Sequence, residues 1–176
     1  TLNDNLYKLY FKPSEAVGGE AAVLRTEPHM EGLGFENYMK TGPAGSGDNG
    51  YIFAFPGQGS AVLRGTIPQG QAEFAIKGAL PDPALFAARS FNAYLMKAGI
   101  NSNKKPYRGV PPAGAKLTLI AETVSASLKS VVRVTNKRSF NLYAELLLRQ
   151  LGGGKLDAGL AAVRSYVSGS GADVSE

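Results

Sequence analysis

The feature that most constrains this chain is a change of hydrophobic pattern along its length. The early part consists of short apolar segments separated by glycine and proline turns, a pattern typical of β-strands. Leu6–Lys12 is the clearest segment, because Tyr7, Leu9 and Phe11 share one face of a strand and are expected to point into a core. Further strands are expected over Ala21–Leu24, Gly34–Met39, Tyr51–Phe55, Ala61–Ile67, Ala72–Ile76 and Leu117–Thr123. The close spacing of the turns predicts antiparallel β structure.

Helical periodicity replaces this pattern after residue 80. Asp82 is expected to cap a helix that begins at Pro83 and ends before Gly99. The residues expected to share one face of this helix are Ala84, Ala88, Phe91 and Leu95. Three later segments repeat the helical spacing: Leu128, Val131, Val132 and Thr135; Leu142, Leu146, Leu147 and Leu151; and Leu156, Leu160, Val163 and Val167. We therefore expect an α+β chain in two parts, with a boundary near residue 115.

The composition excludes several kinds of site. The 176 residues include no cysteine and one histidine, which removes thiol nucleophiles, thiolate metal sites and histidine-rich zinc sites. His29 lies in a predicted loop and is expected to be an exposed imidazole. The net charge of +5 suits an anionic partner, but the basic residues are scattered, which argues against nucleic-acid binding. No apolar stretch reaches the ~18 residues of a membrane-spanning helix.

Three short motifs match known patterns only by their letters. Gly45–Gly50 reads G-x-G-x-x-G, but a predicted strand follows it where a dinucleotide-binding fingerprint needs a helix. Lys40-Thr41-Gly42 and Ser102–Lys105 match the K-T-G and S-x-x-K elements of active-serine penicilloyl enzymes. Their order along the chain is reversed, and Ser102 lies in a predicted loop instead of a helix. We therefore predict a glycine turn and two chance matches.

The S-x-N element of the same enzymes occurs twice. Ser90 and Asn92 fall within the predicted helix, where they lie about 200° apart and cannot converge. Ser139 and Asn141 fall at a predicted helix–helix junction, where positions i and i+2 can face one cleft. The alternative interpretation is that Ser139 or Asn141 caps a helix N-terminus, and spacing alone favours that alternative.

A family resemblance decides between these interpretations. Val132–Gly152, which contains Ser139-Phe140-Asn141, closely resembles the second-motif region of the D-alanyl-D-alanine carboxypeptidase/endopeptidase family, the class C low-molecular-mass penicillin-binding proteins. Thr41–Ile52, Leu63–Pro68 and Lys77–Phe86 resemble the accessory region that this family inserts between its first and second motifs.

The resemblance implies a division of the chain and a role for each part. Residues 1–115 would be the β-rich accessory region, and residues 116–176 would be the helical part of a transpeptidase/β-lactamase-like domain. The nucleophile motif and the third motif would lie outside the chain, so that the chain alone is expected to be inactive. Its opening at Thr1 and the polar tail over Gly169–Glu176 are interpreted as the ends of an excised piece.

The resemblance also implies the chemistry. Ser139 would relay a proton toward the leaving D-Ala amine, and Asn141 would hydrogen-bond the substrate amide and orient the catalytic lysine. Phe140 is larger than the small polar residue that often stands between them. The implied partners are peptidoglycan stem peptides, β-lactams and the rest of the complete chain, in the periplasm or outside the bacterial cell, with no cofactor. The alternative is a non-catalytic module that binds peptidoglycan or protein.

Overall fold

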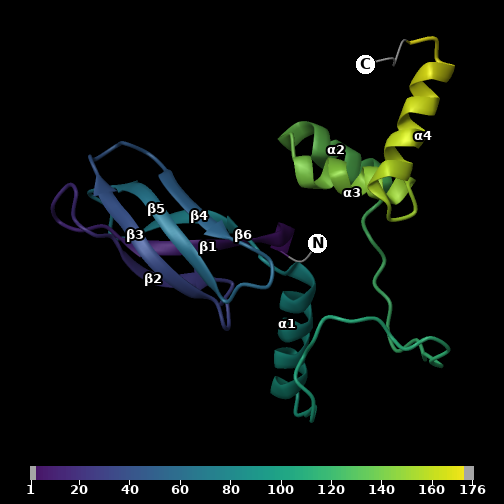
Figure 1. Ribbon diagram of the computed structural model, residues 1–176, viewed down its shortest axis with the longest axis horizontal. Coiled ribbons are helices and arrows are strands. Elements are labelled where there is room, and N and C mark those ends of the chain that lie inside the picture. The colour runs from purple at the N-terminus through teal and green to yellow at the C-terminus, as the bar shows by residue number, and fades with distance from the viewer. Residues whose placement is uncertain (1–2, 173–176) are drawn as a thin grey trace. The chain divides into compact units, whose positions relative to one another are not determined.

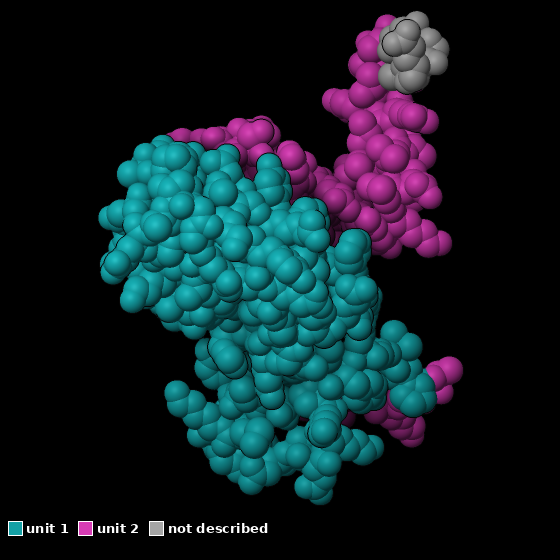
Figure 2. Space-filling model, turned by 60° about the vertical axis from the view of Figure 1, so that its left-hand side comes forward, with its two compact units in different colours: residues 1–112 teal, residues 113–176 magenta. Residues whose placement is uncertain are grey.

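The computed structural model describes residues 3–172 and divides the chain into two compact units, Thr1–Pro112 and Ala113–Glu176 (Figure 2). Unit 1 contains the 3-10 turn η1 (Asn3–Asn5), strands β1 (Leu6–Lys12), β2 (Ala22–Glu27), β3 (Gly34–Gly42), β4 (Asn49–Ala54), β5 (Ser60–Pro68) and β6 (Phe74–Ala79), and helix α1 (Pro83–Lys97) (Figure 1). Unit 2 contains helices α2 (Leu128–Arg138), α3 (Asn141–Leu151) and α4 (Leu156–Gly169). The predicted α+β class is confirmed, and the predicted polar tail lies outside the described residues from position 173 onward.

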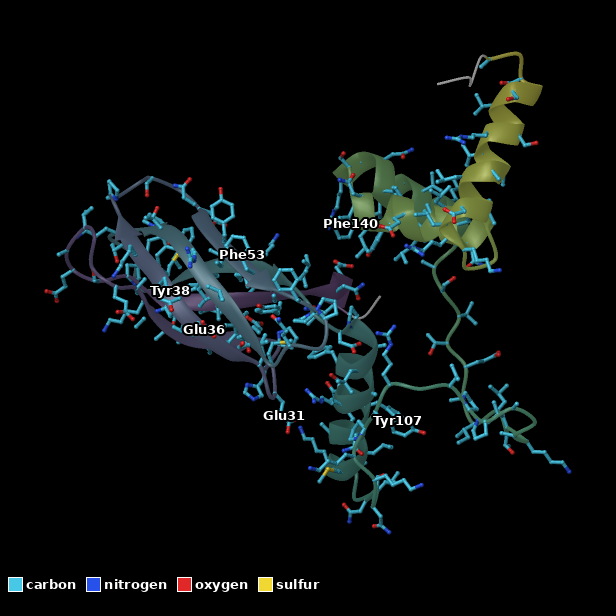
Figure 3. All side chains as sticks on the ribbon, in the orientation of Figure 1. Glu31, Glu36, Tyr38, Phe53, Tyr107 and Phe140 are labelled. Atoms are coloured by element: carbon cyan, nitrogen blue, oxygen red, sulfur yellow. The ribbon has the colours of Figure 1, made fainter. Side chains whose placement is uncertain are left out.

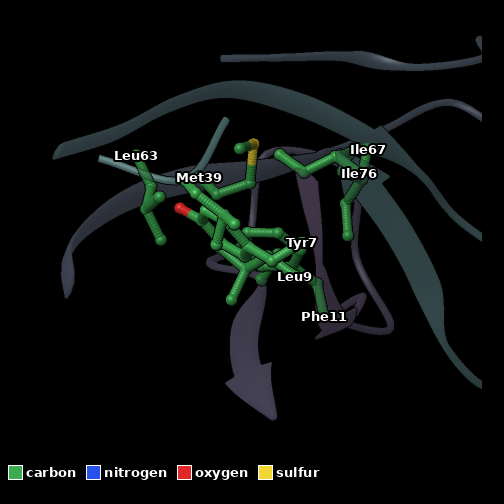
Figure 4. Close-up of a cluster of buried hydrophobic side chains, with 9 residues drawn as sticks. Tyr7, Leu9, Phe11, Met39, Leu63, Ile67 and Ile76 are labelled. Atoms are coloured by element: carbon green, nitrogen blue, oxygen red, sulfur yellow. The ribbon is translucent and has the colours of Figure 1, made fainter. Parts of the chain in front are cut away.

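Two three-stranded sheets enclose the core of unit 1. The first has the order β2-β1-β6 and is antiparallel throughout. The predicted inward face of β1 is confirmed, because Tyr7, Leu9 and Phe11 are all buried. They pack in one cluster with Met39 and Leu63 of the second sheet (Figure 4). Burial of each such side chain contributes roughly 1.5–3 kcal/mol, so this cluster holds the two sheets together.

The second sheet differs from the predicted antiparallel arrangement. Its order is β3-β5-β4, with β4 antiparallel and β3 parallel to β5. The chain does reverse at each turn, as the glycines and prolines predict. However, the segment after Gly42 crosses the end of β5, so that β4 pairs with one edge of β5 and β3 with the other. Turn residues mark where a chain reverses, but they do not select the neighbour of a strand.

The prediction of a strand over Leu117–Thr123 is wrong. These residues adopt no regular structure, and Leu117, Leu119 and Ile120 are exposed. A strand needs a neighbour that completes its ladder of hydrogen bonds. Among the described residues of unit 2, every regular element is a helix, so this apolar segment finds no partner there.

Helix α1 begins and ends as predicted, but a different face contacts the core. Asp82 caps it by accepting a hydrogen bond from the Leu85 amide at 3.0 Å, and Gly99 follows it with a φ of +80°. Phe91, which belongs to the apolar face expected from the periodicity, is exposed, whereas Phe86 packs against the buried cluster. Helical periodicity identifies a stripe, and the sheet that receives the helix decides which side of it is covered.

Gly159 is the one buried residue among the described residues of unit 2. A Cβ atom at this position would overlap the carbonyl oxygen of Leu148 in α3. The glycine therefore allows α3 and α4 to approach each other closely. The three helices follow the segments predicted from the periodicity.

Replacement of Tyr7 by phenylalanine tests a polar atom buried in the core. Burial raises the pKa of Tyr7 from its ordinary value of 10.0 to about 12, and its hydroxyl has no hydrogen-bond partner among the described residues. The unfolded chain loses this proton near pH 10, whereas the folded chain keeps it, so the free energy of unfolding falls as the pH rises from ~10 toward ~12. We expect Tyr7→Phe to be as stable as the wild type or about 1 kcal/mol more stable at neutral pH, with a larger advantage near ~pH 11.

Urea denaturation at both pH values measures this difference. A Tyr7→Phe variant that loses stability at neutral pH would show that the hydroxyl has a favourable interaction in the folded protein. A difference between variant and wild type that stays constant up to ~pH 11 would show that Tyr7 does not titrate as described.

Candidate active site

The junction between α2 and α3 places Ser139 in an unusual backbone conformation. Helix α2 ends at Arg138, and Ser139 follows in the left-handed region with a φ of 49° and a ψ of 48°. The amides of Ser139 and Phe140 both donate to the carbonyl oxygen of Thr135, the latter at 3.1 Å. Glycine or asparagine usually occupies this position in a helix end, because a residue with a Cβ pays roughly 1–2 kcal/mol there. Strain of this kind is concentrated at functional sites.

Phe140 anchors the junction. Its side chain is labelled in Figure 3. The centre of its ring lies 4.6 Å from the centre of the Tyr143 ring, at an interplanar angle of 59°. Its carbonyl oxygen accepts hydrogen bonds from the amides of Tyr143 and Ala144, at 3.1 and 3.3 Å, and so starts helix α3. The bulky middle residue therefore has a packing role between the two polar residues that flank it.

The side chains of Ser139 and Asn141 make no structural hydrogen bond within the described residues. Both residues are exposed, and neither side chain has a hydrogen-bond partner among residues 3–172. The residue before α3 is Phe140, and no side chain caps the helix. The alternative interpretation, in which one of these residues is an N-cap, is therefore wrong. The hydroxyl and the carboxamide are both available to a group from outside this part of the chain.

Helix α2 gives the junction a positive environment. The helix contains no acidic residue and four basic ones, Lys129, Arg133, Lys137 and Arg138. None of them forms an ion pair with a described residue. Arg133, Lys137 and Arg138 line a shallow hollow on the helix surface. Two of the cations lie in the last turn, where they interact favourably with the helix dipole, and an anionic ligand would be attracted to this end of α2.

The residues of the other two active-serine motifs, which were predicted to be chance matches, make local structural contacts. Thr41 is buried in β3, and its hydroxyl accepts a hydrogen bond from the Ser14 amide at 2.8 Å. Ser102 lies in a loop and donates to the carbonyl oxygen of Lys104 at 3.1 Å. No hydrogen bond joins Ser102 to the Lys105 amine in the described structure, so this pair lacks the contact that would activate a nucleophile.

The remaining candidates from the sequence are also explained. Gly45–Gly50 forms a turn that leads into β4, without a following helix. His29 is exposed in a loop, and Ser90 and Asn92 lie within α1. No group of three or more potential metal ligands occurs among residues 3–172.

The sequence did not predict the left-handed conformation of Ser139, or that the cations beside it form no ion pair with a described residue. No sequence signal marks this conformation, because position 139 is a serine and not the glycine that usually adopts it. The cations do have a sequence signal, because Lys129, Arg133 and Lys137 follow each other at intervals of four residues and therefore share a helix face.

Comparison with known proteins places this chain in a family. A D-alanyl-D-alanine carboxypeptidase from Actinomadura sp. (strain R39) is 28% identical over 144 residues, which cover 78% of this chain and 27% of that protein. A crystal structure of penicillin binding protein 4 from Haemophilus influenzae, complexed with a β-lactam, superposes with a TM-score of 0.70 at 17% identity, over 95% of this chain and 39% of that chain. This chain therefore spans well under half of either relative. The sequence profile of one family matches all of residues 1–176, and the chain belongs to that family, the D-Ala-D-Ala carboxypeptidase 3 (S13) family.

Proposed function

We propose that this chain is part of a serine-type D-Ala-D-Ala carboxypeptidase or endopeptidase. The complete protein would cleave peptidoglycan stem peptides through an acyl-enzyme and would bind penicillins covalently. The observation that carries the proposal is the family match over the whole chain. The matched residues include Ser139 and Asn141, whose side chains do not cap helix α3. The Actinomadura relative is a D-alanyl-D-alanine carboxypeptidase, which supports the same substrate class.

The proposed reaction needs a proton relay and a hydrogen-bonding amide, which Ser139 and Asn141 can supply. A serine outside this chain attacks the carbonyl carbon between the two D-Ala residues, and the C–N bond to the terminal D-Ala breaks. The leaving amine needs a proton, which we assign to the hydroxyl of Ser139 as a relay from the catalytic lysine. Asn141 would hold the substrate amide and that lysine through its carboxamide. Water then hydrolyses the ester and frees the serine.

The exposed apolar residues of unit 2 support the proposal that it is one part of a larger domain. Leu128 and Leu151 are 67% and 65% exposed, and Ile120 is 95% exposed. Soluble monomers rarely leave so many large apolar side chains in water. We therefore assign residues 116–176 to a partial transpeptidase-like domain, whose remaining part would cover these side chains. Residues 1–115, which contain their own buried cluster, would be the accessory region.

The proposed location is the bacterial cell envelope outside the cytoplasm, where the substrate polymer lies. Among residues 3–172, no helix combines the length and the hydropathy needed to cross a bilayer. The net charge of +5 is compatible with an anionic cell-wall polymer.

Intact-mass spectrometry with a labelled penicillin tests the proposed function. We expect a penicilloyl adduct on the full-length protein and none on this chain alone, because the nucleophile would lie outside it. An adduct on this chain would show that the reactive residue lies within it, and Ser102 beside Lys105 would be the first candidate. The absence of an adduct from both would contradict the enzymatic function and favour the non-catalytic binding module.

A further inference from the structure

The outer face of the second sheet of unit 1 carries aromatic rings in water. Met39 and Leu63 point from this sheet into the core. On the opposite face, Tyr38 is 56% exposed, Tyr51 62% and Phe53 48%. We call these three rings, together with Arg64, the aromatic face; Figure 3 labels Tyr38 and Phe53 on their strands.

Regular strand pairing positions the aromatic face. Tyr38 of β3 and Tyr51 of β4 both pair with Arg64 of β5, so the three residues form one row across the sheet. Neighbouring strands lie about 4.8 Å apart, and the two tyrosines are therefore held on either side of the arginine. The Arg64 guanidinium lies 5.5 Å from the centre of the Tyr38 ring. Tyr51 and Phe53 are stacked at 6.3 Å. The sheet thus presents these groups in a fixed arrangement.

The other sheet of the same unit provides a comparison. There, Arg25 stacks on Tyr10 at 3.9 Å, which resembles the pair of Arg64 and Tyr38. Arg25 is also paired with Glu73 at 2.7 Å, and Tyr10 donates a hydrogen bond to Glu27 at 2.7 Å. Carboxylates of the chain itself therefore satisfy both members of that pair.

Arg64 differs from Arg25 in this respect. No carboxylate of residues 3–172 lies within ion-pair distance of Arg64. A guanidinium is built for bidentate pairing with a carboxylate. The aromatic face therefore offers a free cation among apolar rings, and the ligand that complements it must combine an anionic group with flat apolar surfaces.

We propose that the aromatic face binds peptide-free glycan strands of peptidoglycan, in which every second amino sugar carries a free carboxylate beside apolar C–H ring faces. The sugar rings would stack on Tyr38, Tyr51 and Phe53, and a carboxylate would pair with Arg64. The assignment to this polymer rests on the proposed function. The inference goes beyond that function, because it gives unit 1 a ligand of its own that contains no scissile peptide bond.

Binding of peptide-free glycan strands to the chain of residues 1–176 tests the proposal. The test variant is the double substitution Tyr38→Thr and Tyr51→Thr, since threonine keeps a strong preference for strands. The control is Tyr107→Thr, which removes a tyrosine that lies in a loop and is 73% exposed (Figure 3). We expect the double variant to bind at least about tenfold more weakly, while the control binds like the wild type. Far-UV circular dichroism and thermal melting verify that the variants are folded.

Arg64→Gln isolates the ionic contact. We expect this variant to bind native strands about tenfold more weakly, and to bind strands whose carboxylates have been reduced to alcohols as the wild type does. Absence of glycan binding, or undiminished binding by the folded double variant, would overturn the proposal. Sedimentation of the wild-type chain as a dimer that the double variant abolishes would overturn it too, in favour of contact between copies.

The glycan experiment and the penicillin experiment can fail independently. Peptide-free strands offer nothing to acylate a serine, and penicillin offers no glycan. A full-length protein that forms the adduct while this chain ignores glycan strands would therefore contradict only the inference about the aromatic face.

Discussion

Replacement of Ser139 by alanine in the full-length protein is expected to lower the rate of D-Ala-D-Ala cleavage by roughly 10²–10⁴-fold, the range for loss of a proton-transfer group. The melting temperature should hardly change. The Ser139 side chain makes no hydrogen bond within the described structure, and alanine keeps the same Cβ in the left-handed position. Steady-state cleavage of a D-Ala-D-Ala peptide, measured beside thermal denaturation, gives both quantities.

A second substitution at the same position separates the hydroxyl from the backbone strain. Ser139→Gly also removes the hydroxyl, but glycine adopts a φ of +49° without the clash that a Cβ causes. We expect this variant to be as inactive as Ser139→Ala and at least as stable as it. Ser130→Ala, which changes an exposed serine of α2, is the matched control. Full activity in either Ser139 variant would remove this residue from the proposed reaction.

The second large effect is expected at Gly65, in the central strand of the second sheet. Gly65 has a φ of +105°, and it pairs with Met39 on one side and Gly50 on the other. A Cβ there would overlap the Asn49 carbonyl oxygen and come within 3.2 Å of the Gly50 Cα. Both are backbone atoms, which cannot rotate away. We expect Gly65→Ala to lower the free energy of unfolding by about 3–5 kcal/mol, at the upper end of single-residue effects.

The matched control for this prediction is Gly57→Ala. Gly57 also has a positive φ, +81°, but a Cβ there would meet no atom within 4 Å. It therefore measures the backbone strain without the overlap, and we expect a loss of about 1 kcal/mol. Urea denaturation of the chain, followed by circular dichroism of the β signal, measures both. Equal losses in the two variants would contradict the role of the overlap.

Local patterns of the sequence predicted those parts of the fold that depend on neighbouring residues. The alternation of Tyr7, Leu9 and Phe11 predicted the buried face of β1, and Asp82 with Pro83 predicted the start of α1. Each signal works within a few residues, because a strand alternates its side chains and a cap satisfies an amide three positions away. The Ser139-Phe140-Asn141 triplet was identified by resemblance, and spacing alone did not distinguish it from a helix cap.

Choices between distant partners were beyond these patterns. Leu117–Thr123 has the composition of a strand but has no neighbour in the described part of unit 2, and β3 pairs with β5 instead of β4. The conformation of Ser139 depends on how α2 ends where it meets α3. Arg25 pairs with the carboxylate of Glu73, 48 residues along the chain, whereas Arg64 has no such partner among the described residues.

The sequence by itself therefore determined the order of the elements apart from the strand wrongly predicted over Leu117–Thr123, the start of α1, the inner face of β1 and the position of the S-x-N triplet. The tertiary structure decided which strands pair, which face of α1 is covered, and which polar groups are left without a partner. The physical reason is that turns and caps are satisfied by atoms close in sequence, whereas burial and ion pairing depend on surfaces that only the folded chain brings together.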